Sequence, residues 1–377
     1  MDIISICVLG NKSCVVTVLQ DTTEGKFMKI GIDAKWYFGG PPSGVRVIRN
    51  LVNNILAIDR SNQYYIFLNK KYKDQQVLFP GSQNVWLVYV WAGNNLLSNL
   101  FVVPLKANRL KLDVMLFQNF VSPFFVGRKV AYIFDALFVS FPQYFSPLER
   151  LYFFFIKYLS WFSDQIVTLS YEEKSRMTRH GFSNLEKIQV IYIGVEKSFT
   201  PMQHKSGHRK EDVKRKYNLP NRYLLYVGRL NARKNIELLV RALSKIRDRS
   251  IPLVIVGKED WKQSDFRLLA KDDQVSNRLI FTGWTADEDL PAIYAGATVF
   301  CFPSYAEGFG LPPLEAMASG VPVVSSNATC LPEVCGNAAL FFSPQQPQEL
   351  AAVIDRLLDD QELYREMVSR GIRHASG

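Results

Sequence analysis

The chain has 377 residues, of which 48% are hydrophobic and 21% are charged, and its net charge is +10. The composition is ordinary for a globular protein, and the length indicates two domains rather than one. No apolar run approaches the roughly 20 residues that a membrane-spanning helix needs. The five cysteines form no CxxC pair, which argues against a disulfide framework and favours a reducing, cytoplasmic environment.

The positive charge is concentrated in the first half. Residues 1–205 hold 23 Lys and Arg against 14 Asp and Glu, a net +9, whereas residues 206–377 hold 22 against 21, a net +1. A basic half can face nucleic acid, an anionic membrane surface or a phosphorylated ligand, or it can be an ordinary solvated surface. Nucleic acid ranks last, because no recognised binding motif is present. The aromatic runs "FQNFVSPFFVG" and "RLYFFFIKYLSWF" fit either adsorption at a membrane interface or core packing, and both readings stay open.

Residues 1–27 precede the first regular pattern, and we expect a disordered extension or a start codon placed too early. From Met28 onward, "MKIGIDA" predicts a strand and "FGGPPSGV" a glycine-rich loop. A helix is predicted next, from the spacing of Val45, Ile48, Leu51, Val52, Ile55 and Leu56. Further strands are predicted at "YYIFLN", "VWLVYVW", "DVMLFQ", "KVAYIFD", "QIVTLS" and "IQVIYIG". This alternation indicates a parallel sheet covered by helices.

The basic stretch "EKSFTPMQHKSGHRKEDVKRKYNLP" predicts a linker that leads into a short helix. Beyond it, helices alternate with strands predicted at "YLLYVGRL", "IPLVIVG", "RLIFTG", "ATVFCFPS" and "VPVVSS". We therefore predict an α/β fold with two Rossmann-like, doubly wound parallel-sheet domains, residues 28–200 and 201–377, facing a cleft. In such folds, ligands bind at the carboxyl ends of the strands.

The stretch "EGFGLPPLEAMASG" begins at Glu307, directly after one of these strands. Gly308 and Gly310 permit positive φ and let a ligand approach the backbone closely. Two prolines suit a helix start and Gly320 suits its end, so the loop offers free N–H groups to phosphate at a helix N-terminus. Glu315 is expected in the first helical turn, where it accepts hydrogen bonds from ribose hydroxyls or simply suits the helix dipole. Glu307 is expected to bind a second set of hydroxyls.

The stretch "VGRLNARKNIELLV" follows another predicted strand, so Arg229 and Lys234 lie at a strand end and a helix start. Two cations beside a helix N-terminus are unfavourable on their own. They become favourable if a diphosphate binds between them, particularly as its charge grows when it leaves a sugar. The alternative is a pair of exposed surface cations.

Together, "GRLNARKN", "FTGW", "LPAIYAGATVFCFPSYAEGFGLPPLEAMASGVPVVSSN" and "LPEVCGNAAL" resemble glycosyltransferase family 4, the retaining GT-B enzymes. The resemblance is densest over residues 222–342 and weaker over residues 28–200. The "RKN" and "VGKEDW" pieces look most like the mannosyltransferase-like bacterial members that build surface polysaccharides. The resemblance implies transfer of a hexose, mannose as first choice, from a nucleotide-diphosphate sugar. The acceptor is a saccharide or a lipid-linked saccharide bound mainly by the first domain.

Carried over residue by residue, the resemblance implies that Glu307 contacts the donor hexose and Glu315 the ribose. Arg229 and Lys234 hold the diphosphate, so that Arg229, Lys234 and Glu307 carry the catalysis. The donor site is completed by backbone groups of the second domain and by a loop of the first: Gly308, Phe309, Gly310, Leu311, Gly40, Ser43 and Gly44.

Two departures from the family pattern stand out. Many members carry His-Asp where this chain has Phe134-Asp135, so the role of the histidine does not transfer and that of Asp135 is left open. The family's final helix usually returns to cover the first domain, whereas this chain stops at "RGIRHASG". We expect that crossing helix to be missing or truncated, which puts domain closure in doubt.

Four other functions are compatible with parts of this pattern. A glycoside hydrolase leaves the glycine loop and the two cations unexplained, and a nicotinamide dehydrogenase lacks a GxGxxG after its first strand. A sugar-nucleotide epimerase of the same fold stays open. So does a degenerate, non-catalytic sugar-nucleotide-binding protein.

The acids at Asp287–Asp289 match the metal-binding motif of a different glycosyltransferase fold. However, Thr285 and Glu288 form a capping-box pattern that opens the helix "DLPAIYAG" and explains the acids without a metal. We predict no metal and no cofactor, only a nucleotide-sugar co-substrate, GDP-mannose or a UDP-sugar. We expect a cytoplasmic protein that makes peripheral contact with the inner face of the plasma membrane through its basic first domain.

Overall fold

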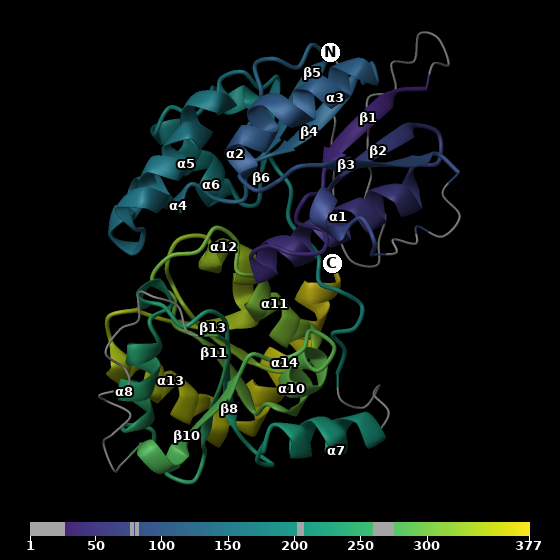
Figure 1. The fold of residues 1–377 in the computed structure, drawn as a ribbon. Coiled ribbons are helices and arrows are strands. Elements are labelled where there is room, and N and C mark those ends of the chain that lie inside the picture. The colour runs from purple at the N-terminus through teal and green to yellow at the C-terminus, as the bar shows by residue number, and fades with distance from the viewer. Residues whose placement is uncertain (1–26, 76–78, 80–82, 202–206, 259–274) are drawn as a thin grey trace. The chain divides into compact units, whose positions relative to one another are not determined.

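The computed structural model describes residues 27–75, 79, 83–201, 207–258 and 275–377. The predicted extension therefore falls outside the described residues, apart from Phe27. Within the described residues the chain divides into two compact units, the first ending at Ile193 and the second beginning at Gly194. Each unit has its own parallel sheet, coloured purple to teal in the first and green to yellow in the second (Figure 1).

The first unit contains a seven-stranded parallel sheet with the order β3-β2-β1-β4-β5-β6-β7. Its strands are β1 (Lys29–Asp33), β2 (Gln63–Asn69), β3 (Val85–Val90), β4 (Val114–Gln118), β5 (Arg128–Tyr132), β6 (Gln165–Thr168) and β7 (Ile188–Val190). All seven match a predicted apolar run, with β2 and β5 beginning one residue earlier than predicted. The last strand is much shorter than its run, because the backbone leaves the sheet after Val190.

The helices of this unit vary from single turns to long amphipathic segments. They are α1 (Pro42–Ile58), α2 (Asn95–Leu97), the π-helical turn η2 (Ser98–Val102), α3 (Val103–Arg109), α4 (Leu137–Ser140), α5 (Pro147–Ser160) and α6 (Tyr171–Arg179), with short 3-10 turns η1 (Lys70–Tyr72), η3 (Pro142–Tyr144) and η4 (Leu185–Lys187). The apolar spacing predicted the long helix α1 correctly.

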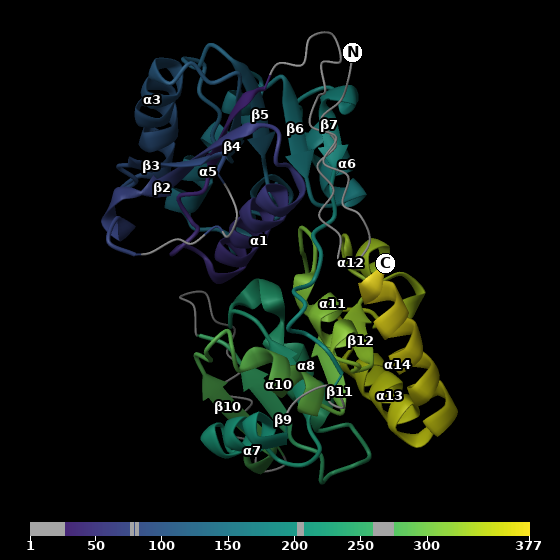
Figure 2. The same ribbon diagram turned by 90° about the vertical axis from the view of Figure 1, so that its right-hand side faces the viewer.

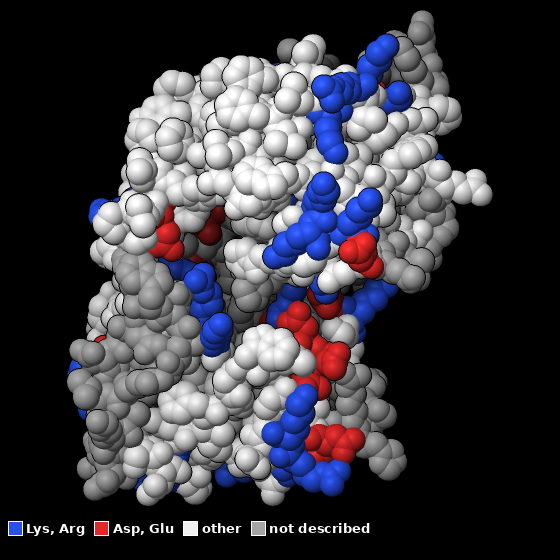
Figure 3. Space-filling model, in the orientation of Figure 1, with Lys and Arg blue, Asp and Glu red and all other residues white. Residues whose placement is uncertain are grey.

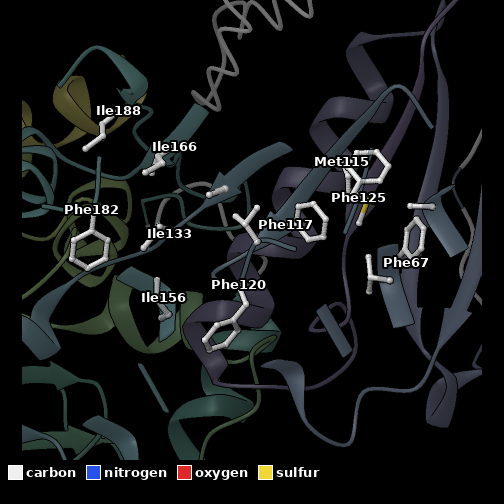
Figure 4. Packing of buried hydrophobic residues seen from close by; sticks show 14 of the residues in the cluster. Phe67, Met115, Phe117, Phe120, Phe125, Ile133, Ile156, Ile166, Phe182 and Ile188 are labelled. Atoms are coloured by element: carbon white, nitrogen blue, oxygen red, sulfur yellow. The ribbon is translucent and has the colours of Figure 1, made fainter. Parts of the chain in front are cut away.

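A large buried cluster joins one face of this sheet to its helices. Met115 of β4, Ala107 of α3, Ile156 of α5 and Met177 of α6 all belong to it. Figure 4 shows the cluster continuing along the sheet through Phe117. The chain passes from β1 to β2 toward one edge of the sheet, whereas it passes from β4 through β7 toward the other edge. Because crossovers between parallel strands are right-handed, α1, which connects β1 to β2, covers the other face of the sheet.

The second unit contains a six-stranded parallel sheet with the order β10-β9-β8-β11-β12-β13. Its strands are β8 (Leu224–Val227), β9 (Leu253–Val256), β10 (Leu279–Gly283), β11 (Val299–Phe302), β12 (Val323–Ser326) and β13 (Ala339–Phe342). The first five were predicted and β13 was not. The two doubly wound sheets confirm the predicted α/β fold class.

Helices cover both faces of this second sheet. They are α7 (Gly207–Lys216), α8 (Ile236–Leu243), α10 (Leu290–Gly296), α11 (Leu311–Ala318), α12 (Leu331–Cys335), α13 (Pro347–Asp359) and α14 (Gln361–Ser376), with 3-10 turns η6 (Ala232–Lys234), η7 (Ser276–Arg278) and η8 (Gly336–Ala338). Helix α8 packs on α13, whereas α11 packs on α10 and α14. Figure 2 shows the last two helices, α13 and α14, running side by side. None of the helices described is both long and apolar enough to cross a membrane.

Candidate functional site

The strand order of the second unit determines where its loops diverge. The chain leaves β8 toward β9 on one side and leaves β11 toward β12 on the other, while β8 and β11 are neighbours. The loops after these two strands therefore separate at their carboxyl ends and leave room for a ligand, as doubly wound sheets do at such a switch point. These loops are the two that the sequence singled out, residues 228–235 and 303–310.

The loop after β8 is shaped by two asparagines. The Asn231 Oδ1 accepts a hydrogen bond of 3.2 Å from the Lys234 N–H, which closes the turn η6. Asn235 then adopts a left-handed conformation with φ of 56°, and its side-chain amide donates to the Pro303 carbonyl at 3.0 Å. That bond ties the loop after β8 to the loop after β11, so cations on one are held next to the carboxylate on the other.

Glu307 is the centre of this junction. Its Oε1 accepts from the Lys234 Nζ at 2.6 Å, and its Oε2 lies 3.0 Å from the Arg233 Nη1. Arg233 also donates to the Ala306 carbonyl. Glu307 and Lys234 are both buried, with 7% and 8% of their surface exposed. The structure thus brings together two of the predicted catalytic residues, Lys234 and Glu307, and adds Arg233, for which the sequence predicted no role.

Burial and charge act against each other at Glu307. Burial alone raises its pKa, but Arg233 and Lys234 outweigh that effect and lower the pKa from 4.5 to about 2. Burial, opposed by Glu307, lowers the pKa of Lys234, and Arg233 and Arg229 lower it further. The site is therefore an ionised carboxylate with an excess of positive charge around it, which suits an incoming polyanion.

The backbone of the Glu307 loop is fixed from behind by the segment before α12. The Glu307 N–H donates to the Thr329 Oγ1 at 3.0 Å. The Cys330 thiol donates to the carbonyls of Glu307 and Phe309, both at 3.1 Å. Gly310 then takes a φ of 104°, and a Cβ there would lie 2.6 Å from the Leu331 side chain. Only glycine suits this position, for conformation and for space.

Helix α11 begins at Leu311, with Gly310 as its N-terminal cap. The first turn of a helix leaves N–H groups without a helical partner, but Pro312 and Pro313 have none to offer. The donors at this helix start are therefore limited to the backbone of the loop 308–310 and of Leu311. These are the backbone groups predicted to bind the donor.

Glu315 does not lie in the first turn, as the sequence reading expected. It is the fifth residue of α11 and is buried at 2% exposure. The Tyr294 hydroxyl of α10 donates to its Oε2 at 2.8 Å. The helix-dipole explanation for an acid in the first turn is therefore wrong here, and the carboxylate is held by a neighbouring helix instead.

Arg229 is exposed on the loop that follows β8. The Tyr226 hydroxyl donates to its backbone carbonyl at 3.0 Å, which anchors the base of that loop. The loop therefore carries three cations, Arg229, Arg233 and Lys234, of which the last two contact Glu307.

The remaining predicted residues lie in the first unit. Ser43 is exposed in the first turn of α1. A Cβ on Gly40 or Gly44 would lie 2.8 Å or 2.6 Å from the Trp36 indole, so both glycines are needed for its close packing. The same indole stacks on Phe134, with ring centroids 5.9 Å apart. Phe134, at the position where the resemblance implied a histidine, is thus part of an aromatic stack.

Asp135 follows this stack along the chain. Its Oδ1 accepts from the Leu137 N–H at 3.2 Å, at the start of α4. Asp135 therefore binds a backbone N–H at the start of α4, which is a structural role.

The acidic run Asp287–Asp289 does not have the capping role that the sequence predicted. Helix α10 begins at Leu290 without a side-chain cap, so the predicted capping box of Thr285 and Glu288 is wrong. Asp289 instead accepts from the Lys216 Nζ at 2.7 Å and the Tyr217 hydroxyl at 2.9 Å. Across the described part of the chain, no three His, Cys, Asp or Glu side chains are grouped as metal ligands.

Comparison with known proteins identifies a matching family and several relatives of this chain. The sequence model of the family described as "Glycosyl transferases group 1" matches residues 209–374. The "O-antigen chain mannosyltransferase B" of Escherichia coli is 32% identical over 264 residues, which cover 68% of this chain and 68% of that protein. The "Serotype-specific mannosyltransferase WbdA" of Escherichia coli is 32% identical over 219 residues, 57% of this chain. The match spans only 27% of the length of WbdA.

Among solved structures, the sucrose-phosphate synthase of Thermosynechococcus elongatus superimposes with a TM-score of 0.70. The match covers 92% of this chain and 94% of that one at 23% sequence identity. At that identity the likeness concerns the fold, which is the same two-sheet architecture.

Proposed function

The chain belongs to the group 1 glycosyltransferases, and we propose that it transfers a hexose, mannose as first choice, from a nucleotide-diphosphate sugar to a saccharide acceptor. It is a mannosyltransferase-like member with the GT-B fold. The proposed activity belongs to polysaccharide synthesis, and the anomeric configuration of the sugar is retained.

One observation carries the proposal. Glu307 is held ionised between Lys234 and Arg233 at the switch point of the second sheet, next to the glycine loop that starts α11. A carboxylate suits the hydroxyls of a neutral sugar, and clustered cations suit a diphosphate. The site thus offers one partner for each half of a nucleotide sugar.

The proposed chemistry is a single group transfer. The bond between the anomeric carbon and the phosphate oxygen breaks, and the acceptor oxygen bonds to that carbon on the same face. The acceptor proton passes to the departing phosphate oxygen, so the protein supplies no separate base. Lys234, Arg233 and Arg229 stabilise the growing charge on the diphosphate, an electrostatic role that raises turnover.

We propose that this reaction needs no divalent metal, because three cations on one loop already supply the charge that a metal would bring. Activity in excess EDTA should equal activity without it. A loss in EDTA that Mn²⁺ restores would contradict this part of the proposal.

The donor and the acceptor are proposed from the relatives and from the chain's own charge. Guanosine diphosphate mannose is the first choice, since the names of the Escherichia coli relatives describe mannosyltransferases. A UDP-sugar is the second. A lipid-linked saccharide is the proposed acceptor, and the basic, aromatic first unit supports its use at the cytoplasmic face of a membrane.

The test follows nucleoside diphosphate release from a panel of GDP- and UDP-sugars, with and without acceptor saccharides. Acceptor-dependent release and a glycosylated product with the donor's anomeric configuration, read by NMR, are expected. Release of diphosphate from none of the donors would favour the non-catalytic binding protein. A free, epimerised sugar as the product would favour the epimerase. A product of the opposite anomer would contradict retention.

A further inference from the structure

Helix α5 is apolar on both of its faces. Tyr152, Ile156 and Leu159 point inward, where Ile156 belongs to the buried cluster and the other two pack against it. The outward positions of the helix and its end follow the same helical spacing and are also apolar. They are Leu148, Leu151, Phe154, Phe155, Tyr158 and Trp161, with exposed fractions from 39% to 79%. Large apolar side chains on the outward side of a helix, beyond those that face its own core, are normally covered by a partner.

The outward rings are packed against one another. The Phe154 and Tyr158 rings lie 4.6 Å apart and the Tyr158 and Trp161 rings 5.6 Å apart, measured between centroids. The indole N–H of Trp161 donates to the Gly181 carbonyl at 2.9 Å, which fixes its orientation. These side chains form a preorganised apolar layer rather than a set of isolated surface residues, and layers of this kind mark interaction surfaces.

A second apolar stripe lies on the neighbouring segment. Leu97, Phe101 and Leu105 recur every four residues and are all exposed. Phe101 stacks on Phe124, which is also exposed, with centroids 5.7 Å apart. The hydroxyl of Tyr152 on α5 forms a hydrogen bond with the backbone of α2, which places the stripe next to the helix. We call the outward side of α5 and this stripe the aromatic face.

The charge around the aromatic face is strongly positive. Residues 95–111 hold three Lys and Arg and no acid, and residues 147–162 hold two and one acid, which gives five against one and a net +4. The one acid, Glu149, is engaged by the Ser146 N–H and hydroxyl at the start of α5. Figure 3 shows a broad surface free of charged side chains over α2 and α5, with Lys and Arg side chains near α3.

This combination selects one occupant. An anionic membrane interface binds surfaces of this kind. The aromatic and aliphatic side chains insert at the level of the headgroups, and the flanking Lys and Arg are attracted by the negative charge of the lipids. A second copy of the chain would oppose two positively charged faces, which is unfavourable.

We propose that the aromatic face docks on an anionic lipid surface. The use of this docking rests on the proposed function: a lipid-linked acceptor would present its saccharide at the lipid surface. The docking itself depends on α5 and its neighbours and not on the donor site in the second unit.

The experiment is co-sedimentation of the full chain with vesicles of phosphatidylglycerol and phosphatidylcholine, compared with phosphatidylcholine alone. We expect binding to the anionic vesicles that weakens as salt rises from 0.05 M to 0.5 M, as screening dictates. The double variant Leu148→Ser/Leu151→Ser should lose binding at least about tenfold, because each leucine inserts apolar surface. The control is Ile58→Ser, an exposed aliphatic residue at the end of α1, on the other face of the sheet, and it should bind like the wild type.

Equal loss of binding in Leu148→Ser/Leu151→Ser and in Ile58→Ser, or equal binding to both kinds of vesicle, would overturn the proposal. Sedimentation velocity without lipid checks the rival occupant, because a dimer that Leu148→Ser/Leu151→Ser dissociates would assign the face to a second copy. Unchanged donor hydrolysis by that variant shows that the second unit is intact. Vesicle binding without transferase activity would contradict the proposed function alone, and transfer without vesicle binding would contradict the docking surface alone.

Discussion

Glu307 is a buried carboxylate that two cations keep ionised, and its removal should affect both stability and turnover. Glu307→Gln leaves the buried Lys234 and the half-buried Arg233 without their counter-charge. We expect the free energy of unfolding at pH 7 to fall by about 3 kcal/mol. Turnover should fall as well, because the sugar loses its carboxylate partner. The control is Glu237→Gln, which removes an exposed pair with Arg241 and should change stability by less than about 0.5 kcal/mol.

The pH dependence of stability provides a second readout of the same carboxylate. Its pKa is lowered from 4.5 to about 2 in the folded state. Glu307 therefore contributes stability above pH 4.5 that is lost as the pH falls from there toward 2. Denaturant unfolding between pH 6 and pH 3 should show a steeper loss for the wild type than for Glu307→Gln. Parallel curves for the two proteins would mean that Glu307 has an ordinary pKa.

The cations are expected to act mainly on turnover. Arg229→Ala and Lys234→Ala should each lower kcat by about 10²–10³, by analogy with the loss of one preorganised donor to a developing anion. The double variant should lose less than the product of the two, because both cations serve one diphosphate. Arg222→Ala removes an exposed cation beside Asp248 and serves as the control. Near-normal kcat in the first two variants would place the diphosphate elsewhere.

Glu315 is expected to act on donor affinity rather than on the chemical step. Glu315→Gln should raise the KM for the donor with little change in kcat, since contacts to ribose change little during transfer. Tyr294→Phe removes the hydroxyl that holds this carboxylate without touching the donor, so we expect a smaller rise in KM. A change in kcat alone for Glu315→Gln would contradict a ribose contact.

At the scale of elements, the start of α11 depends on a glycine that no other residue replaces well. Gly310→Ala forces a Cβ into left-handed backbone and to within 2.6 Å of Leu331. We expect a loss of about 2 kcal/mol of stability, partly from strain and partly from displacing a buried leucine. Gly283→Ala is the matched control, since its φ is 68° but nothing lies within 4 Å of the added Cβ. If the two variants are equally destabilised, the contact with Leu331 is unimportant.

Strands were the elements that the sequence predicted best, because a buried parallel strand is a continuous apolar run. β13 was missed, although it is as long as β8, β9, β11 and β12, and its pairing with β12 identifies it. Glu315 lies just beyond the first turn in which it was expected, since the helix starts at Leu311 and not at the prolines. The ion pair between Arg233 and Glu307 joins residues that are far apart in the sequence. Without knowing which strands are neighbours, the sequence does not show which of the adjacent basic residues contacts Glu307.

At the scale of the whole molecule, each unit has a sheet of its own, and the large cluster of the first unit is made only of residues up to Ile188. Units with separate cores can unfold in separate steps. Calorimetry of the full chain should therefore show two transitions. Glu307→Gln should lower only the one that belongs to the second unit.

The same experiment identifies the nucleotide and the unit that holds it. A ligand at 100 times its dissociation constant stabilises the state that binds it by about 2.7 kcal/mol. For a unit of this size, that corresponds to a rise of roughly 5–10 °C in its melting temperature. GDP should therefore raise the transition that Glu307→Gln lowers, and leave the other unchanged, because the proposed diphosphate contacts lie on the loops after β8 and β11. A larger rise with UDP would replace guanosine by uridine as the first choice, and a rise in the other transition would move the donor site to the first unit.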